Sequence, residues 1–360
     1  MLFFKYLKLR IIIFLRKKKL LSYKKIIYLS CHSVLEFDEI NIFRDLGHYV
    51  FSPGDYVNEK QKGRPWLRPS QLESYDHVKH LKKFLSYGKK SYENKSNLSK
   101  EFIQDFDIVY VMHNPEWIIK NWEVIKHKTV IWRTIGQSNE IIEKELLNYR
   151  RNGLKIIRYS PKEKNITNYL GHDAIIRFYK DPNEFNNWDP RINKIMNITQ
   201  DFSLRSLHCN YELYEFVSKH LPCDLYGYGN NNINAELSFE ELKKRLKAYR
   251  CYFYTGTYPA SYTLSFIEAW MTGIPIVALG NKLKHSNLPN NNLYEIPDII
   301  THGRNGFIAD TKKELLAILK KLLSDKKFAL KISKKARQDS IKIFGKKTIM
   351  FQWEQFYKNL

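Results

Sequence analysis

The sequence is poor in cysteine, in acidic residues relative to basic ones, and in long apolar runs at its start. Its four cysteines, Cys31, Cys209, Cys223 and Cys251, are scattered, with no C-x-x-C pair and no histidine cluster at metal-ligand spacing. This pattern argues against a disulfide-rich secreted fold and against a structural zinc site. We expect reduced thiols in a cytoplasmic protein.

The first thirty residues are apolar and basic, but they lack a long uninterrupted apolar run. They hold nine Lys or Arg and no acid, and their longest apolar run, Ile11–Leu15, has five residues. A membrane-spanning helix needs roughly 20 apolar residues and a signal-peptide core about 7 to 15, so neither is predicted. Residues 1–22 instead predict a basic amphipathic extension on an anionic membrane surface, with a surface-packed helix of solvated cations as the alternative.

The shortage of acids gives the chain a strong positive charge. Lys and Arg number 60 against 37 Asp and Glu, for a formal net charge of +23. This balance favours an anionic partner: nucleic acid, an acidic membrane surface or a phosphorylated small molecule. The alternative explanation of the positive charge is compositional drift, because coding DNA rich in A and T favours Lys, Asn, Ile and Tyr. With 360 residues and 43% hydrophobic residues, the chain can form two packed domains and is not expected to be disordered.

The first half alternates short buried strands with helices, which is the pattern of a parallel sheet covered on both faces. A helix that begins near Leu35 is expected to end at Gly47, a typical C-cap residue, and Val50 begins the next strand. Residues 23–180 are therefore expected to form one domain. Its other strands are expected at 24–30, 106–113, 128–136, 154–161 and 173–179.

The same alternation resumes after a polar, Pro- and Asn-rich segment at 181–193, which is the expected linker. Residues 194–345 are expected to form the second domain, and 346–360 a helix that packs back on the first. The predicted fold class is α/β, with two Rossmann-like, doubly wound parallel-sheet domains facing each other across a cleft. Ligands of such sheets bind beyond the carboxyl ends of the strands. Strands of the second domain are expected at 194–199, 223–229, 251–256 and 275–280.

The segment "SYTLSFIEAWMTGIPIVALGN", residues 261–281, places a helix directly after a strand. Ser261 is the predicted N-cap, so the unpaired amides of the next residues, Tyr262, Thr263 and Leu264 among them, are expected to face an anion. Glu268 lies one to two turns into this helix among apolar neighbours. A carboxylate near a phosphate site can accept hydrogen bonds from two ribose hydroxyls, whereas a solvated glutamate is the alternative.

Residues 251–310 resemble the donor-binding half of glycosyltransferase family 4, the group 1 glycosyltransferases of the B-type two-Rossmann (GT-B) fold. "ASYTLSFIEAWMTGIPIVA" is similar to the family segment E-G-F-G-L-x-x-x-E-A-x-A-x-G-x-P-V-V-A. "LYEIPDIITHGRNGFIAD" resembles its P-E-x-I-x-x-G-x-N-G-x-L segment, and "LGHYV" at 46–50 its first helix end. The matching positions are Leu264, Glu268, Ala269, Gly273, Pro275, Val277, Ala278, Glu295, Gly303, Asn305 and Gly306.

The resemblance implies a nucleotide-sugar site for a UDP-, GDP- or ADP-sugar. Glu268 would bind the ribose and Arg205 the diphosphate. Two family positions differ, because Ala260 replaces the glutamate that contacts the sugar and Gln200 replaces a phosphate-binding arginine. The remaining donor-binding candidates are Gly229, Ser261, Tyr262, Thr263, Leu264 and Glu295.

Two strand ends of the first domain carry candidate acceptor-side groups. The family often has a functional histidine where His113 ends its strand, and Arg133 ends the next one; with Arg205 these are the candidate catalytic residues. A capping or core histidine and an arginine paired with a carboxylate are the alternatives. His32 and Ser33 lie at the first strand-to-helix turn, where the family usually has a glycine-rich loop.

The implied activity is transfer of a sugar, with retained anomeric configuration, to a glycan or lipid-linked acceptor. The expected setting is surface polysaccharide or lipopolysaccharide biosynthesis, in the cytoplasm and peripherally on the inner face of the cytoplasmic membrane. No cofactor and no metal are expected, since the D-x-D at Asp105–Asp107 precedes a strand instead of following one.

Three other functions stay open from the sequence. A nicotinamide-dependent oxidoreductase would need G-x-G-x-x-G, and "GYGNNN" at 227–232 lacks the third glycine. A nucleic-acid-binding or nucleic-acid-modifying protein would explain the charge, although the cations concentrate at the two ends of the chain instead of in a recognisable module. A catalytically silent partner subunit with the glycosyltransferase fold would explain Ala260.

Overall fold

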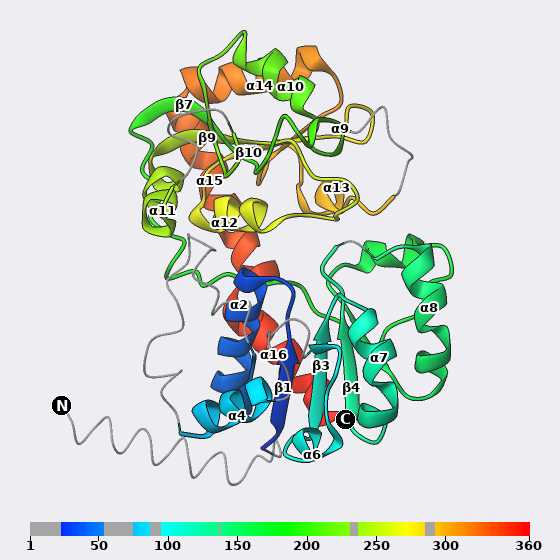
Figure 1. Cartoon of the computed structure of the whole chain (residues 1–360). Helices are drawn as coiled ribbons and strands as arrows, with labels where there is room; N and C mark the ends of the chain where they lie inside the picture. The colour runs from blue at the N-terminus through cyan, green and yellow to red at the C-terminus, as the bar shows by residue number, and fades with distance from the viewer. Residues whose placement is uncertain (1–22, 54–74, 87–94, 137, 231–236, 285–291) are drawn as a thin grey trace, which may run out of the picture.

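The computed structural model describes residues 23–53, 75–86, 95–136, 138–230, 237–284 and 292–360. The predicted basic extension, 1–22, lies outside these residues. Two α/β domains follow each other along the chain, one below the other in Figure 1. The predicted fold class, two Rossmann-like domains with parallel sheets, is confirmed.

The first domain contains a six-stranded sheet of order β2-β1-β3-β4-β5-β6, and every pair of neighbours is parallel. The chain order reverses at β1, whose neighbours are β2 and β3. The strands are β1 (Lys25–Leu29), β2 (Tyr49–Phe51), β3 (Ile108–Met112), β4 (Thr129–Arg133), β5 (Lys155–Arg158) and β6 (Ala174–Ile175). The helices are α2 (Ser33–Asp45), α4 (Tyr75–Ser86), α6 (Lys100–Ile103), α7 (Glu116–Ile125), α8 (Glu140–Arg151) and the 3-10 helix η1 (Pro161–Asn165).

The second domain contains a five-stranded parallel sheet of order β11-β10-β9-β7-β8, with the reversal at β7. The strands are β7 (Ile192–Ile198), β8 (Cys223–Tyr226), β9 (Tyr249–Tyr254), β10 (Ile276–Leu279) and β11 (Phe307–Ala309). The helices are α9 (Ser206–Cys209), α10 (Tyr211–Ser218), α11 (Phe239–Ala248), α12 (Leu264–Thr272), α13 (Ile296–Ile299), α14 (Lys312–Ser324) and α15 (Lys326–Phe344).

Local sequence signals explain most of these boundaries. Gly47 has φ +93°, a left-handed conformation that ends α2 where a helix end is predicted. Ser238 and Glu241 form a capping box at the start of α11. The predicted strand at 173–179 is shorter than expected, because only Ala174–Ile175 pairs with β5 before the chain turns away from the sheet.

Alternating strand residues form cores on opposite faces of the first sheet. Tyr28 and Tyr110 face one core, and Val109 and Trp132 face the other, which α7 covers. The first of these cores continues into the second domain, where it includes Trp270 of α12. The two domains therefore share buried apolar contacts.

The chain crosses between the domains twice at one place. Lys180 leaves the first domain, and its backbone N–H donates to the carbonyl of Phe344 at 3.0 Å, next to Gly345 where the chain returns. The returning helix, α16 (Lys346–Lys358), lies against the first domain (Figure 1), with Trp353 edge-on to Phe43 at 4.7 Å between ring centroids. None of the helices within the described ranges combines the length and apolar composition that a membrane span needs.

The packing of α16 gives a stability prediction. Trp353 is fully buried, so Trp353→Ala is expected to lower the free energy of unfolding by about 3–5 kcal/mol through lost apolar burial and a residual cavity. Phe351 on the same helix is 58% exposed, and Phe351→Ala is the matched control with an expected change under about 0.5 kcal/mol. Urea denaturation of both variants measures the difference. Equal effects would contradict a structural role for this helix face.

Candidate functional site

The carboxyl edges of the two sheets face each other. Tyr159 follows β5, and its hydroxyl accepts a hydrogen bond from the backbone N–H of Ser261, which follows β9, at 2.6 Å. An ideal Cβ added to Gly136, beyond β4, would lie 3.4 Å from the Cβ of Ala260. Loops that follow strands of both domains therefore meet, which is where ligands of doubly wound sheets bind.

Glycines are required where the loops after β7 and β8 interlock. Gly229 has φ +76°, and a Cβ there would lie 1.7 Å from the Oδ1 of Asp201. Gly227 has φ +127°, and its Cβ would lie 2.4 Å from the carbonyl oxygen of Thr199. Gly229, a predicted donor-binding residue, thus has a clear packing role in bringing these two strand ends together.

Arg205 lies directly before α9, at the carboxyl end of the strand where the order of the second sheet reverses. The residue is partly exposed, and the one hydrogen bond of its guanidinium in the described structure is a long one of 3.4 Å to the carbonyl of Gln200. The α9 segment is held against the loop after β9, because the backbone N–H of Tyr258 donates to the carbonyl of His208 at 2.7 Å. Arg205 therefore presents a cation at the predicted edge.

The helix that carries Glu268 begins two residues later than predicted. Thr263, not Ser261, is the N-cap of α12, and its side chain makes no capping hydrogen bond. No acceptor among the described residues takes the backbone N–H of Leu264 or Ser265, and both residues are partly exposed. An uncapped first turn remains at this helix end, with amides and a dipole that favour an anion.

Ser261 and Tyr262 belong to the contact between the domains. The N–H of Ser261 is taken by the Tyr159 hydroxyl, and the hydroxyl of Tyr262 donates to the carbonyl of Tyr159 at 2.8 Å. Both residues are buried. The prediction that Ser261 caps the helix is wrong, because the chain stays extended over the first domain before the helix begins.

Glu268 is buried, with 6% of its surface exposed, so it is not a solvated side chain. Its Oε1 lies 3.0 Å from the Nζ of Lys180, and the same Nζ lies 2.7 Å from the Oδ2 of Asp38 on α2. Apolar residues flank it on its own helix, among them Ile267 and Ala269. A buried carboxylate thus lies just inside the uncapped end of α12, balanced by a cation from the crossing point.

Glu295 is not available in the way that the sequence predicts. It is 2% exposed, its Oε1 pairs with Arg177, and its Oε2 accepts from the hydroxyl of Ser160 at 2.6 Å. Both partners come from the first domain. Glu295 therefore joins the domains, since a buried carboxylate needs hydrogen-bond partners and the first domain supplies them.

His113 lies where β3 ends, in a conformation that is uncommon for a side-chain-bearing residue. Its φ is +60°, and its carbonyl accepts from the indole N–H of Trp132 at 2.8 Å. The ring Nδ1 is buried and has no hydrogen-bond partner within the described part of the chain. Burial lowers the pKa of His113, which favours a neutral imidazole at pH 7. Strained backbone with an unpaired buried nitrogen is typical of functional positions.

Arg133 has a structural role in the core of the first domain. Arg133 is fully buried; its Nε pairs with Glu39 at 2.9 Å, and its NH1 donates to the carbonyls of Arg158 and Ile176. All these partners belong to the first domain, so the structure corrects the prediction of a catalytic arginine and matches the alternative, an arginine paired with a carboxylate.

The turn after β1 begins a helix. His32 is the N-cap of α2, and its Nδ1 accepts from the N–H of Leu35 at 3.4 Å. Ser33 is the first helical residue, and both lie half-buried at the same sheet edge as His113. His32 therefore has a capping role at the start of α2, in the place where the resembled family usually has a glycine-rich loop.

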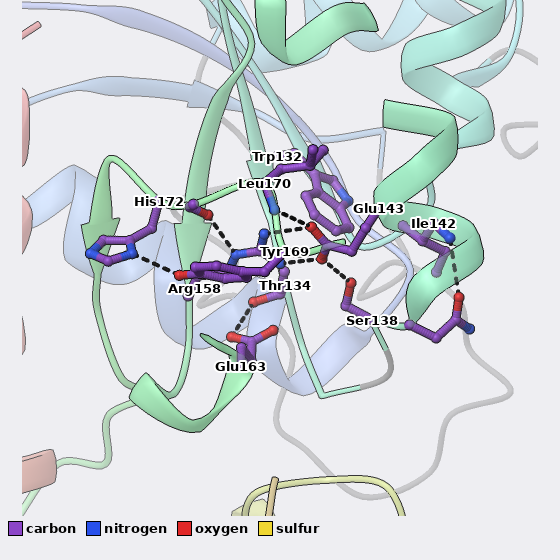
Figure 2. Close-up of polar contacts among 12 residues, drawn as sticks. Trp132, Thr134, Ser138, Ile142, Glu143, Arg158, Glu163, Tyr169, Leu170 and His172 are labelled. Atoms are coloured by element: carbon purple, nitrogen blue, oxygen red, sulfur yellow. Dashed lines mark hydrogen bonds and ion pairs between the residues drawn. The ribbon is translucent and has the colours of Figure 1, made fainter. Parts of the chain in front are cut away.

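Sequence reasoning missed a buried polar cluster beyond β4 and β5 (Figure 2). Arg158 forms two hydrogen bonds to Glu143 of α8, at 2.6 and 2.8 Å, and both side chains are fully buried. Glu163 accepts from the hydroxyl of Thr134 at 2.8 Å and from the N–H of Tyr159 at 2.9 Å. The cluster holds the loop after β5 in place, and Tyr159 of that loop contacts Ser261 of the second domain.

Two surface pockets, of about 220 and 110 Å³, lie away from this edge. One is lined in part by Lys155 and Asp173 and the other by Lys25 and Asp105, all at the amino ends of first-domain strands. In the described ranges, no group of three or more His, Cys, Asp or Glu side chains has the geometry to hold a metal ion.

Comparison with known proteins identifies structures of the same fold. No protein-family model matches the sequence, and no curated protein matches it. Sucrose-phosphate synthase from Thermosynechococcus elongatus is similar with a TM-score of 0.65 and 12% identity, over 93% of this chain and 98% of that one.

Two further structures cover almost the whole chain. Anabaena HepE, in complex with UDP-glucose, has a TM-score of 0.60 and 13% identity, over 94% of this chain and 100% of that one. A glycosyltransferase from Rickettsia africae has a TM-score of 0.58 and 14% identity, over 94% and 98%. At these identities the likeness shows the GT-B fold.

Glu163 gives a prediction for the pH dependence of stability. Burial raises the pKa of Glu163 from 4.5 to about 7, so the folded state keeps a proton that the unfolded state loses. The contribution of Glu163 to the free energy of unfolding is therefore complete below pH 4.5, where the side chain is protonated in both states, and is lost as the pH rises to about 7. At about 1.4 kcal/mol per tenfold change in proton affinity, the loss is about 3 kcal/mol.

Glu163→Gln keeps the acceptor oxygen but removes this titration. Urea denaturation at pH 5 and pH 8 is expected to show a smaller loss of stability in the variant than in the wild type. Glu101→Gln, at an exposed acid, is the matched control and should follow the wild type. Parallel pH profiles of wild type and Glu163→Gln would refute the assignment.

Proposed function

We propose that the protein is a glycosyltransferase that uses a nucleotide-sugar donor. The observation that carries the proposal is the geometry of α12: an uncapped, partly exposed first turn, with the buried carboxylate of Glu268 directly behind it, at the carboxyl edge of the second sheet. An anion and a diol are the two groups that this arrangement suits. The GT-B fold and the complexes of HepE with UDP and UDP-glucose support the choice of a nucleotide sugar.

In the proposed complex, the diphosphate binds the first-turn amides of α12 and the guanidinium of Arg205. The ribose hydroxyls donate to Glu268. Arg205 suits this role because a guanidinium offers several donors in one plane and its present hydrogen bond to Gln200 is long. Amides of the peptide chain need no reorganisation when the charge on the diphosphate increases.

The proposed reaction breaks the bond between the sugar and the diphosphate, and the acceptor hydroxyl bonds to the same anomeric carbon. Retention of configuration follows if the departing diphosphate takes the acceptor proton on the same face of the sugar. Catalysis is then mainly stabilisation of the leaving group, and one such contact is worth about 3 kcal/mol, or roughly a hundredfold in rate. A neutral His113 at the opposite sheet edge could accept a hydrogen bond from a sugar or acceptor hydroxyl.

A second candidate, a silent partner subunit with this fold, has two observations in its favour. Ala260 replaces the sugar-contacting glutamate of the resembled family and lies against the loop of Gly136 in the first domain. Both carboxylate oxygens of Glu295 are bound by residues of the first domain, Arg177 and Ser160. Assays of sugar transfer and donor hydrolysis across UDP-, GDP- and ADP-sugars separate the two functions, since a silent subunit would bind the nucleotide without consuming it.

The acceptor is proposed to be a glycan or a lipid-linked glycan at an anionic membrane surface. The net charge of +23 and the basic, apolar residues 1–22 support this location, and both suit surface polysaccharide or lipopolysaccharide biosynthesis on the cytoplasmic side. Nucleic acid is a less suitable partner, because the cations concentrate at the two ends of the chain and not in a recognisable nucleic-acid module.

The nucleotide site is tested by thermal shift with UDP, GDP and ADP. At least one nucleotide is expected to raise the melting temperature, and Glu268→Ala should erase the rise because the ribose loses its acceptor. The variant should fold, since Lys180 keeps Asp38 as a partner. Glu212→Ala, at an exposed acid of α10, is the matched control. A full shift in Glu268→Ala would remove this residue from the site.

The membrane proposal is tested by sedimentation with liposomes. The whole chain should bind vesicles that contain about a third anionic lipid and release them in high salt, because each Lys or Arg near such a surface gains about 1 kcal/mol. A chain that starts at residue 23 should bind at least tenfold more weakly. Heparin retention run in parallel reports any general affinity for polyanions. Equal vesicle binding by both chains would exclude residues 1–22 as the membrane contact.

A further inference from the structure

Lys180 is a buried cation at the point where the chain crosses between the domains. Its side chain is 1% exposed, and its backbone pairs with the return crossing at Phe344 and Gly345. The aromatic ring of Phe185 lies 5.9 Å from its Nζ. A lysine is almost never buried to this degree unless its charge is compensated.

Two carboxylates from different domains compensate it. Asp38 of α2 is 2.7 Å away, and Glu268 of α12 is 3.0 Å away; their side chains are 7% and 8% exposed. Each acid lies in a different domain, and Lys180 is the group that both share. The direction of the Glu268 carboxylate therefore depends on a residue outside its own helix and its own sheet.

We propose that Lys180 is a positioning residue for the donor ribose: it holds the Glu268 carboxylate in the orientation that accepts the ribose hydroxyls. The inference rests on the proposed function, and it adds that ribose recognition depends on a side chain from the interdomain crossing. A glutamate has three rotatable side-chain bonds, and an ion pair at one oxygen restricts them before the ligand arrives. Asp38 of the first domain holds Lys180 in turn. The orientation of Glu268 at the ribose site therefore depends on the position of the first domain.

The experiment compares affinity for UDP and for 2′,3′-dideoxy-UDP by calorimetry, with the full chain. In the wild type, UDP is expected to bind at least about tenfold more tightly, because hydrogen bonds to a charged acceptor are lost with the hydroxyls. In Lys180→Met the ratio should fall below about threefold, while the affinity for the dideoxy nucleotide changes less than about threefold. Lys180→Arg should recover part of the ratio.

A matched control is available in Lys162, which also joins the domains. Its Nζ lies 2.6 Å from the Oδ2 of Asp298 of α13, and no contact links it to Glu268 in the described structure. Lys162→Met should keep the wild-type ratio, so loss of an interdomain ion pair alone does not produce the effect. If Lys180→Met does not fold, the double variant Lys180→Met/Asp38→Asn, which removes one of the two buried acids, gives the same readout.

The outcomes separate this inference from the proposed function. A ratio that collapses in Lys180→Met but not in Lys162→Met supports the positioning role. A wild-type ratio in folded Lys180→Met, together with a collapsed ratio in Glu268→Gln, overturns the role of Lys180 and leaves the nucleotide site in place. Wild-type protein that binds both nucleotides equally overturns the ribose role of Glu268 and with it the positioning role of Lys180, but leaves the nucleotide site in place. Wild-type protein that binds neither of them, and none of UDP, GDP and ADP in the thermal-shift assay, overturns both.

Discussion

The buried ion pairs of Lys180 with Asp38 and Glu268 constrain the whole molecule. They lie where the chain passes from one sheet to the other, next to Gly345, the residue between α15 and α16. Charges that leave water without partners are strongly destabilising, so the arrangement in which all three groups meet is favoured over any that separates them. The carboxyl edges of the two sheets face each other under this constraint, together with the shared apolar core.

Contacts between the domains divide the polar residues of the sheet edges into two sets. Ser261, Tyr262 and Glu295 are used to join the second domain to Tyr159, Ser160 and Arg177 of the first. The first turn of α12 and Arg205 are not used in this way. The part of the edge that these contacts leave unused is thus the part next to the reversal of strand order at β7, where the topology of doubly wound sheets places ligands.

The sequence predicted the fold well, and it also predicted that Glu268 is not a solvated side chain. Apolar strands, helix ends such as Gly47 and the carboxylate of Glu268 within an apolar helix are local signals, and each corresponds to what the structure contains. Two local predictions were wrong in detail. The strand at 173–179 shrank to Ala174–Ile175, and α12 begins at Leu264, because packing against the first domain keeps the chain extended at Ser261 and Tyr262.

Other features had no local signal. Arg133 ends a strand, as a ligand-binding residue would, yet Glu39, 94 positions away, draws it into the core. The pair of Arg158 and Glu143 looks in the sequence like any strand-end arginine and any helical acid. The composition and periodicity of the chain by themselves determined two parallel sheets and the helix that carries Glu268, since burial patterns repeat over a few residues. Only the tertiary structure decided which charges share a buried site, because Lys180 and Asp38 are 142 positions apart and meet through the packing of two domains.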